Sequence, residues 1–246
     1  MSPASLDDAR WKQAEVVLLD IEGTISSISF VKDVMYPYAL DSLTRLARNS
    51  WSDADFQNLI ASFPADSKTS ADALIAHVED LTRRDIKATY LKQLQGTLWT
   101  TGFRNGDLKT PLFDDVVPTL EQWKFARGKT LAIFSSGSVA AQLQFFSYVR
   151  DGGPEDGTRD IRSLFAAHFD TVNAGPKMQK ESYEKICKEL DRDVSAVAFL
   201  TDNVKEAEAA MEAGVYAVVV DRPGNAALEE EAREKFVVVE RLDELP

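Results

Sequence analysis

The chain has 246 residues, 44% of them hydrophobic, which is enough for one large domain or a domain with an insertion. Its formal charge of −12 argues against a nucleic acid partner, because nucleic acid phosphates would be repelled. Residues 1–12 contain no apolar signal region, and no apolar run approaches the ~20 residues of a membrane span, so we expect no membrane association. The single cysteine, Cys187, excludes an intrachain disulfide framework, and its helical spacing with Tyr183 and Ile186 predicts a core position in a protein of a reducing compartment.

Short apolar runs predict the strands of a sheet, and amphipathic patterns predict helices between them. The strands are expected at 16–20, 130–135, 169–173, 196–202, 216–221 and 236–239. Helices are expected at 138–149, 177–190 and 204–213, the last ending at Gly214, a residue type common after helix C-termini. Alternating strands and helices indicate an α/β fold with a parallel sheet covered on both faces.

More than a hundred residues separate the first two predicted strands, and this interval has mostly helical patterns. Helices are expected at 53–63, 70–84, 88–98 and 116–126, with Ser70 or Thr69 as an N-cap. We therefore predict a core made of 1–27 and 114–246, with an all-helical insert at 28–113. Residues 150–160 are rich in Gly, Pro and acidic side chains and predict a surface loop.

Two carboxylates, Asp20 and Glu22, follow the first strand in the sequence Asp-Ile-Glu-Gly-Thr. Open α/β sheets carry their chemistry at the carboxyl ends of the strands. Asp20 can act there as a nucleophile toward phosphorus, forming an acyl phosphate. Glu22 can act as the acid and base for the leaving group. The alternative is an acidic turn after an ordinary strand.

Three further strand ends carry polar groups suited to phosphate chemistry. Ser135 and Ser136 can donate hydrogen bonds to a phosphate, although Ser138 can also be a simple helix N-cap. Lys177 can neutralise a phosphate and the attacking Asp together; Lys180, one turn later, is its rival, and a solvated lysine is the alternative. Asp202 can complete a Mg²⁺ site with Asp20, or instead cap the helix that starts at Val204.

The order of these signals resembles the haloacid dehalogenase superfamily, and the chain also resembles one family within it, the enolase-phosphatases of methionine salvage. The supporting segments are 18–24, 28–34, 91–96, 134–139, 180–183, 199–202 and 222–226, so the resemblance spans nearly the whole chain. Glu22 is discriminating, because phosphatases of the wider superfamily usually have Asp at that position. The segment Leu-Lys-Gln-Leu-Gln-Gly at 91–96 is also specific to the family.

The resemblance implies a Rossmann-like haloacid dehalogenase core with a helical cap and a bifunctional, Mg²⁺-dependent enzyme. This enzyme enolises 2,3-diketo-5-methylthiopentyl-1-phosphate and then releases phosphate and the acireductone 1,2-dihydroxy-3-keto-5-methylthiopentene. We assign one Mg²⁺ per subunit to Asp20, Asp202 and Glu22, with the backbone carbonyl of Glu22 as an alternative to its side chain. The enolisation base is left open between Glu22, Asp20 and a residue of the insert. A cytoplasmic monomer is expected, with the nucleus as a further compartment.

The chain departs from the family pattern at several positions near the predicted site. Ile25-Ser26-Ser27 stands where the family usually has threonines and a proline, Pro176 replaces a His before the lysine, and Asn203 follows the metal aspartate in place of Val. None of these changes removes a charged catalytic group. The rival interpretations are another phosphatase of the superfamily and, more remotely, a non-catalytic binding protein on the same fold.

Overall fold

The structure is a computed structural model that describes residues 8–84, 86, 88–152 and 157–246. It divides into two compact units, the first made of 1–28 and 110–246 and the second of 29–109. The sequence predicts 28–113 for the insert. Among the described residues, none of the helices is both long and apolar enough to cross a membrane.

The first unit contains a six-stranded parallel sheet. Its strands are β1 (Val16–Leu19), β2 (Thr130–Phe134), β5 (Ala167–Phe169), β6 (Val197–Thr201), β7 (Tyr216–Val220) and β8 (Val237–Val239). They lie in the order β5-β2-β1-β6-β7-β8, and Leu19 at the end of β1 is level with Ile133 and Leu200 on its two neighbours. The α/β fold with a parallel sheet that the sequence predicts is therefore confirmed.

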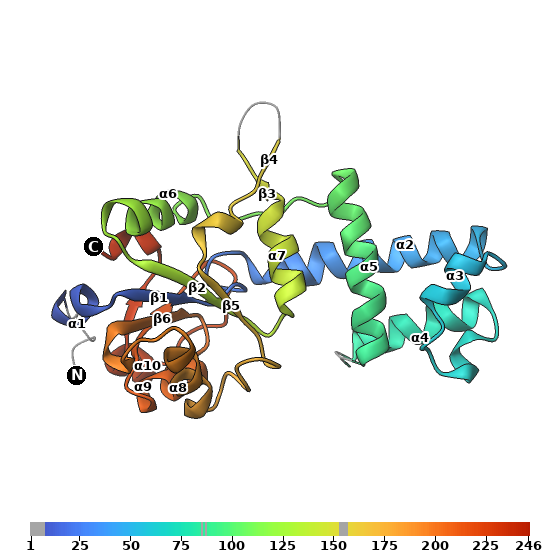
Figure 1. Cartoon of the computed structure of the whole chain (residues 1–246). Helices are drawn as coiled ribbons and strands as arrows, with labels where there is room; N and C mark the ends of the chain where they lie inside the picture. The colour runs from blue at the N-terminus through green and yellow to red at the C-terminus, as the bar shows by residue number, and fades with distance from the viewer. Residues whose placement is uncertain (1–7, 85, 87, 153–156) are drawn as a thin grey trace. The chain divides into compact units, whose positions relative to one another are not determined.

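Helices cover both faces of this sheet. Val16, Leu18 and Phe134 belong to a buried cluster that includes Tyr183 and Ile186 of α8 (Lys180–Glu189) and Ala207 of α9 (Val204–Glu212). The alternate residues Val17, Leu19 and Ile133 point to the opposite face and are also buried, as expected for strands in the middle of an α/β fold. Figure 1 shows α8, α9 and α10 (Glu230–Lys235) on one side of the strands and α6 (Val116–Glu121) on the other.

The remaining elements of the first unit are short. They are α1 (Asp8–Gln13), the π-helix Gln122–Ala126, α7 (Val139–Ser147), the strand pair β3 (Val149–Arg150) and β4 (Thr158–Arg159), and the 3₁₀ turns Arg162–Leu164, Val194–Ala196 and Leu242–Glu244. The pair β3 and β4 lies at the two ends of the predicted surface loop 150–160, of which 153–156 lie outside the described residues. Cys187 is buried, as predicted, and burial raises the pKa of its thiol to about 11.

The second unit is helical in the part of the chain that the structure describes. It contains the π-helix Phe30–Met35, α2 (Tyr36–Asn49), α3 (Ala54–Leu59), the 3₁₀ turn Ala65–Lys68, α4 (Ala71–Arg83) and α5 (Thr89–Asn105). Ser70 is the N-cap of α4 and accepts a hydrogen bond from Ala73 N at 3.1 Å. Leu43, Leu74 and Leu98 are members of its own buried cluster, so this unit has a separate core.

Several predicted boundaries are wrong: the helix expected at 88–98 continues to Asn105, the one expected at 53–63 ends at Leu59, and two further errors lie next to the predicted site. The third strand was expected at 169–173, but β5 ends at Phe169, because Asp170 accepts hydrogen bonds from Val172 N and Asn173 N at 2.8 and 2.9 Å and turns the chain. The next helix was expected from 177, but α8 begins at Lys180. Residues 170–179 thus form a loop at the carboxyl edge of the sheet.

Candidate active site at the carboxyl edge of the sheet

The strand order brings three of the predicted site residues to one place. β1 lies between β2 and β6, so Asp20, Ser135 and Asp202 follow three adjacent parallel strands at the same edge. Asp20 N donates to Leu200 O at 2.9 Å, which extends the β1–β6 pairing up to the carboxylate. The chain runs from β1 toward β2 and β5 and then returns to β6 on the other side of β1. Ligands of open α/β sheets bind where the strand order reverses in this way.

Asp20 has its two carboxylate oxygens in separate contacts. Oδ1 accepts a hydrogen bond from Ile21 N at 2.7 Å, and Oδ2 lies 2.8 Å from Lys177 Nζ. The side chain of Asp20 is buried, as are those of Lys177 and Ser135. A carboxylate fixed by a backbone amide and an ammonium group has a defined orientation toward the edge of the sheet.

Lys177 reaches Asp20 from the loop 170–179. Tyr183 Oη donates to Lys177 O at 2.7 Å and so fixes this loop on α8. Burial lowers the pKa of Lys177, but the carboxylates of Asp20 and Glu206 raise it more, so the ammonium group stays charged. Lys180, the rival lysine, is exposed at the start of α8. The geometry therefore brings together Lys177 and Asp20.

Glu206 is a member of this cluster that the sequence analysis missed. Its Oε2 lies 2.6 Å from Lys177 Nζ and accepts a hydrogen bond from Thr201 Oγ1 at 2.9 Å. Burial and the nearby Asp20 raise the pKa of Glu206. One signal was present in the sequence: Glu206 stands four residues after Asp202, in the first turn of α9, on the face that also buries Ala207 and Ala210.

Asp202 lies against the loop that follows β1. An added Cβ at Gly23, whose φ is +72°, would lie 2.6 Å from Asp202 Cγ, so the carboxylate packs directly on this glycine. Burial raises the pKa of Asp202 to about 7, and the charges of Asp20 and Glu206 act in the same direction. The N-cap of α9 is Asn203, which accepts from Lys205 N at 3.0 Å, so the helix-cap alternative for Asp202 is wrong.

Glu22 lies on the tight turn after β1 and is half-buried. Ile25 N and Ser26 N both donate to Ile21 O at 3.0 Å, and Gly23 N donates to Ser26 O at 2.8 Å. This turn reverses the chain directly after Asp20. Glu22 lies within this turn, two residues after Asp20.

The serine residues after β2 have different surroundings. Ser135 Oγ is buried and accepts a hydrogen bond from Gly137 N at 3.2 Å, while Ser136 is exposed. Ser138 is the N-cap of α7 and accepts from Ala141 N at 3.3 Å, so the capping role considered for it is confirmed. Ser135 and Ser136 thus remain as the hydroxyl groups of this turn that do not cap the helix.

The charges of this cluster suit a cation and a phosphate together. Asp20, Asp202 and Glu206 are three carboxylates, and Lys177 is the cation that contacts two of them. Within the described ranges, no group of three or more His, Cys, Asp or Glu side chains has the arrangement of a metal site. A metal at this edge would therefore need backbone or substrate oxygens in addition to carboxylates, which is how Mg²⁺ is commonly held.

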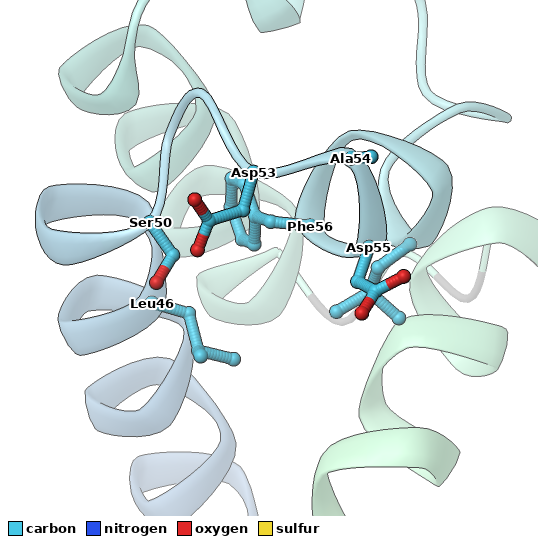
Figure 2. Close-up of a pocket in the computed structure, with 7 residues that line it drawn as sticks. Leu46, Ser50, Asp53, Ala54, Asp55 and Phe56 are labelled. Carbon is cyan, nitrogen blue, oxygen red and sulfur yellow. The ribbon is translucent and has the colours of Figure 1, made fainter.

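A surface pocket in the second unit is less suited to binding a phosphate group. Figure 2 shows Ser50, Asp53, Asp55 and Phe56 among the residues that line it, together with Leu46. The two aspartates would repel a phosphate group. The edge of the sheet differs in having Lys177 in contact with two of its carboxylates, whereas the described residues that line this pocket include no lysine or arginine.

Comparison with known proteins decides the family. A family model described as haloacid dehalogenase-like hydrolase matches residues 14–214. Enolase-phosphatase E1 of Sordaria macrospora is 50% identical over 232 residues, which cover 94% of this chain and 97% of that protein. The chain belongs to the enolase-phosphatase E1 family of haloacid dehalogenase-like hydrolases. Enolase-phosphatase E1 of Neurospora crassa is likewise 50% identical over 231 residues and covers the same shares.

Solved structures match the fold of this chain. The crystal structure of the UTR4 protein of Saccharomyces cerevisiae matches with a TM-score of 0.82 and 34% identity, over 94% of this chain and 100% of that chain. CbbY from Rhodobacter sphaeroides matches with a TM-score of 0.60 and 16% identity, over 94% and 96%, which supports the fold alone. The family and the fold that the sequence predicts are both confirmed.

Proposed function

We propose that this member of the enolase-phosphatase family converts 2,3-diketo-5-methylthiopentyl-1-phosphate into the acireductone 1,2-dihydroxy-3-keto-5-methylthiopentene and phosphate. The observation that carries the proposal is the buried contact of Lys177 with Asp20 at the edge of the sheet, 2.8 Å from Nζ to Oδ2. Relatives named Enolase-phosphatase E1 share half of the sequence over nearly the whole chain, including this region. The substrate is the one that the resemblance implies.

The first step is the transfer of a proton from the carbon next to the substrate carbonyl to a protein base. A carboxylate suits this role, and Glu22, Asp20 and a residue of the insert are the candidates. The electron pair of the broken C–H bond forms the new C=C bond, the π pair of the carbonyl moves to its oxygen, and the protonated base returns its proton to this oxygen to give the enol. Ser135 and Ser136 are proposed to hold the phosphate by hydrogen bonds during this step.

The second step is phosphoryl transfer to Asp20. An oxygen of Asp20 attacks phosphorus, the bond from phosphorus to the substrate oxygen breaks, and Glu22 supplies the proton that the leaving oxygen takes up. Water then attacks the acyl phosphate, with Glu22 accepting its proton, and phosphate is released. Lys177 is proposed to balance the charge of the phosphoryl group and of Asp20 throughout.

We propose that Asp20, Asp202 and the backbone carbonyl of Glu22 hold one Mg²⁺ per subunit. The carboxylates fit such a group, because Asp20, Asp202 and Glu206 outnumber the one nearby ammonium group, and burial followed by the charges of Asp20 and Glu206 raises the pKa of Asp202 despite the opposing effect of Lys177. When bound, the cation would polarise the substrate carbonyl and shield the phosphate charge. The family resemblance further supports a cytoplasmic monomer, with the nucleus as a further compartment, and a cap role for the helical unit.

A direct assay tests the proposal. The purified protein is given the diketone phosphate with and without Mg²⁺, and enol absorbance and free phosphate are followed together. The proposal predicts both products with Mg²⁺ and a strong preference over a generic aryl phosphate. Phosphate release without enol formation, or equal rates on both substrates, would instead favour another phosphatase of the superfamily.

A further inference from the structure

The segment Arg222-Pro223-Gly224-Asn225 is a tight turn that the proposed reaction does not use. Asn225 N donates to Arg222 O at 3.1 Å, and Gly224 has a φ of +94°. Pro at the second position and Gly with positive φ at the third are the preferences of a type II turn. The turn follows β7 and presents the side chains of Arg222 and Asn225 to neighbouring segments.

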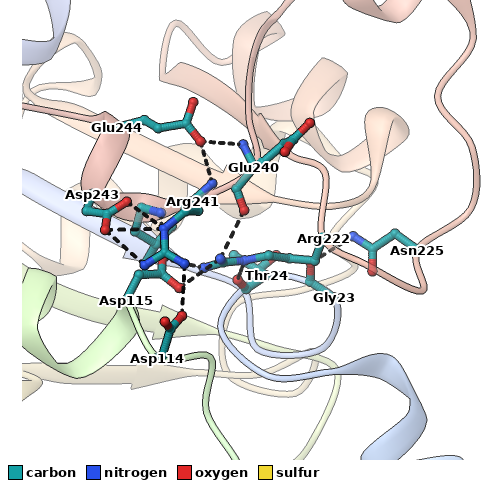
Figure 3. Close-up of polar contacts among 11 residues, drawn as sticks. Gly23, Thr24, Asp114, Asp115, Arg222, Asn225, Glu240, Arg241, Asp243 and Glu244 are labelled. Atoms are coloured by element: carbon teal, nitrogen blue, oxygen red, sulfur yellow. Dashed lines mark hydrogen bonds and ion pairs between the residues drawn. The ribbon is translucent and has the colours of Figure 1, made fainter.

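Both side chains bind the backbone of the loop that follows β1. Arg222 Nε donates to Thr24 O at 2.9 Å, and Asn225 Nδ2 donates to Gly23 O at 2.8 Å. Two successive carbonyl groups, directly after Glu22, are therefore held from about 200 residues away in sequence. Figure 3 shows Arg222 and Asn225 against Gly23 and Thr24.

Arg222 is itself fixed by a buried ion pair. Its Nη1 and Nη2 donate to the two oxygens of Asp115 at 2.8 Å each, and both side chains are almost fully buried. Burial raises the pKa of the Asp115 carboxyl, but Arg222 and the Leu242 amide lower it more, so the carboxylate stays ionised. A forked guanidinium group in this geometry has little freedom to move.

Asn225 of the same turn also packs against Gly23, the glycine of the loop that contacts Asp202. A Cβ at Gly23 would lie 3.0 Å from Asn225 Oδ1 as well as 2.6 Å from Asp202 Cγ. Gly23 is thus enclosed between Asp202, a proposed Mg²⁺ ligand, and Asn225. A displacement of Asn225 would let the loop move and change the position of Glu22 relative to Asp202.

We propose that Arg222 and Asn225 are positioning residues for the reaction: they hold the loop 22–24 in the conformation that aligns Glu22 and the carboxylates around it. This inference rests on the proposed function for its kinetic consequences, but its structural part concerns the loop alone. Misplacing a catalytic group by about 1 Å can cost about a hundredfold in rate, and outer groups that orient a metal site typically contribute 10–100-fold.

The test uses Asn225→Leu, which keeps the side-chain size and removes the donor. We expect kcat to fall about 10–100-fold with KM within about threefold, and amide hydrogen exchange of residues 21–26 to accelerate. Arg241→Gln is the matched control, because Arg241 lies in the same cluster but its exposed guanidinium group binds Asp114 and Asp243, and among the described contacts none joins it to the loop 22–24. Arg241→Gln should change neither kcat nor the amide hydrogen exchange of residues 21–26.

Arg222→Lys is the second variant, because it keeps a positive charge beside Asp115 while losing the Nε donor that reaches Thr24 O. It should show the same pattern of kcat and exchange, whereas removal of the charge could unfold the protein. Wild-type kcat per folded molecule and unchanged exchange in both variants would overturn the inference. An inactive wild-type protein whose loop exchange still accelerates in the variants would instead contradict the proposed function alone.

Discussion

At the scale of single residues, the surroundings of Lys177 distinguish the predicted site from the end of an ordinary strand. A lysine at the entry to a helix is usually solvated, but this one is buried and within 2.8 Å of Asp20 and 2.6 Å of Glu206. The sequence left Lys177 and Lys180 as rivals because Pro176 differs from the family pattern. The structure has Lys177 in the loop and Lys180 exposed on α8.

Lys177→Ala should therefore lower activity far more than Lys180→Ala. Loss of a positioned charge at a phosphoryl site costs about 3–4 kcal/mol by analogy with oxyanion-hole donors, roughly a hundredfold or more in rate. A solvated lysine should matter little, with under about 0.5 kcal/mol in stability. Steady-state kinetics on both variants decides the matter, and a larger loss for Lys180→Ala would reverse the assignment.

Asp20→Asn should abolish phosphate release while the fold is kept, because an amide cannot form the acyl phosphate. The variant keeps the side-chain shape and an oxygen that can accept from Ile21 N, and Lys177 keeps its contact with Glu206, so circular dichroism should show a folded protein. The thermal midpoint should fall, because the buried ammonium group of Lys177 loses one of its two carboxylate partners. Phosphate release is then measured at saturating substrate. A folded variant with more than about a hundredth of wild-type turnover would contradict a nucleophilic Asp20.

At the scale of elements, the positions of most strands and their parallel arrangement could be predicted, but the course of the loop after the third strand could not. The runs at 16–20, 130–135 and 216–221 are β-branched and apolar, and each lies within a residue or so of an observed strand. The third strand was displaced because Asp170 bonds to amides within its own loop. A side chain that turns the backbone locally leaves no periodic signal.

The residues of the candidate site likewise divide into those that the sequence could predict and those that it could not. Asp20, Ser135 and Asp202 could be found because each comes directly after an apolar run. Glu206 and Arg222 could not be found in this way, since one lies within a helix and the other acts through contacts with Thr24 and Asp115 that only the folded chain brings together. Contacts between residues 107 and 198 positions apart leave no local pattern.

Gly23→Ala tests the close packing of the loop after β1. The φ of +72° should cost about 1–2 kcal/mol for any residue with a Cβ. At Gly23 the new methyl group would also push against Asp202, so we expect a loss of activity beyond the loss of stability. Gly128→Ala is the matched control: its φ is +68°, and its Cβ would meet nothing within 4 Å. Equal activity of the two variants would contradict the packing argument.

At the scale of the whole molecule, the carboxylates of the site make stability depend on pH and on Mg²⁺. The pKa of Asp202 is raised to about 7 by burial and by Asp20 and Glu206, above the 3.8 of a free side chain. Between these values the folded protein binds more protons than the unfolded chain, so its stability falls as pH rises. Bound Mg²⁺ should offset this loss, because it binds the ionised carboxylates.

Without Mg²⁺, the thermal midpoint should therefore fall between pH 5 and pH 8, and added Mg²⁺ should raise it more at pH 8 than at pH 5. Asp202→Asn removes the titrating group and should flatten the metal-free profile. Differential scanning calorimetry on both proteins provides the comparison. A wild-type midpoint that rises over this range, or the same slope in the variant, would count against the assigned role of Asp202.

The central claim is that one site performs both enolisation and phosphate release, and Asp202→Ala tests it most directly. Enol absorbance and free phosphate are followed with the diketone phosphate over a range of Mg²⁺ concentrations, with wild type in parallel. Because the proposed metal site serves both steps, both rates should fall together by at least about tenfold, and the Mg²⁺ requirement should rise. Enol formation at the wild-type rate alongside reduced phosphate release would contradict a shared site.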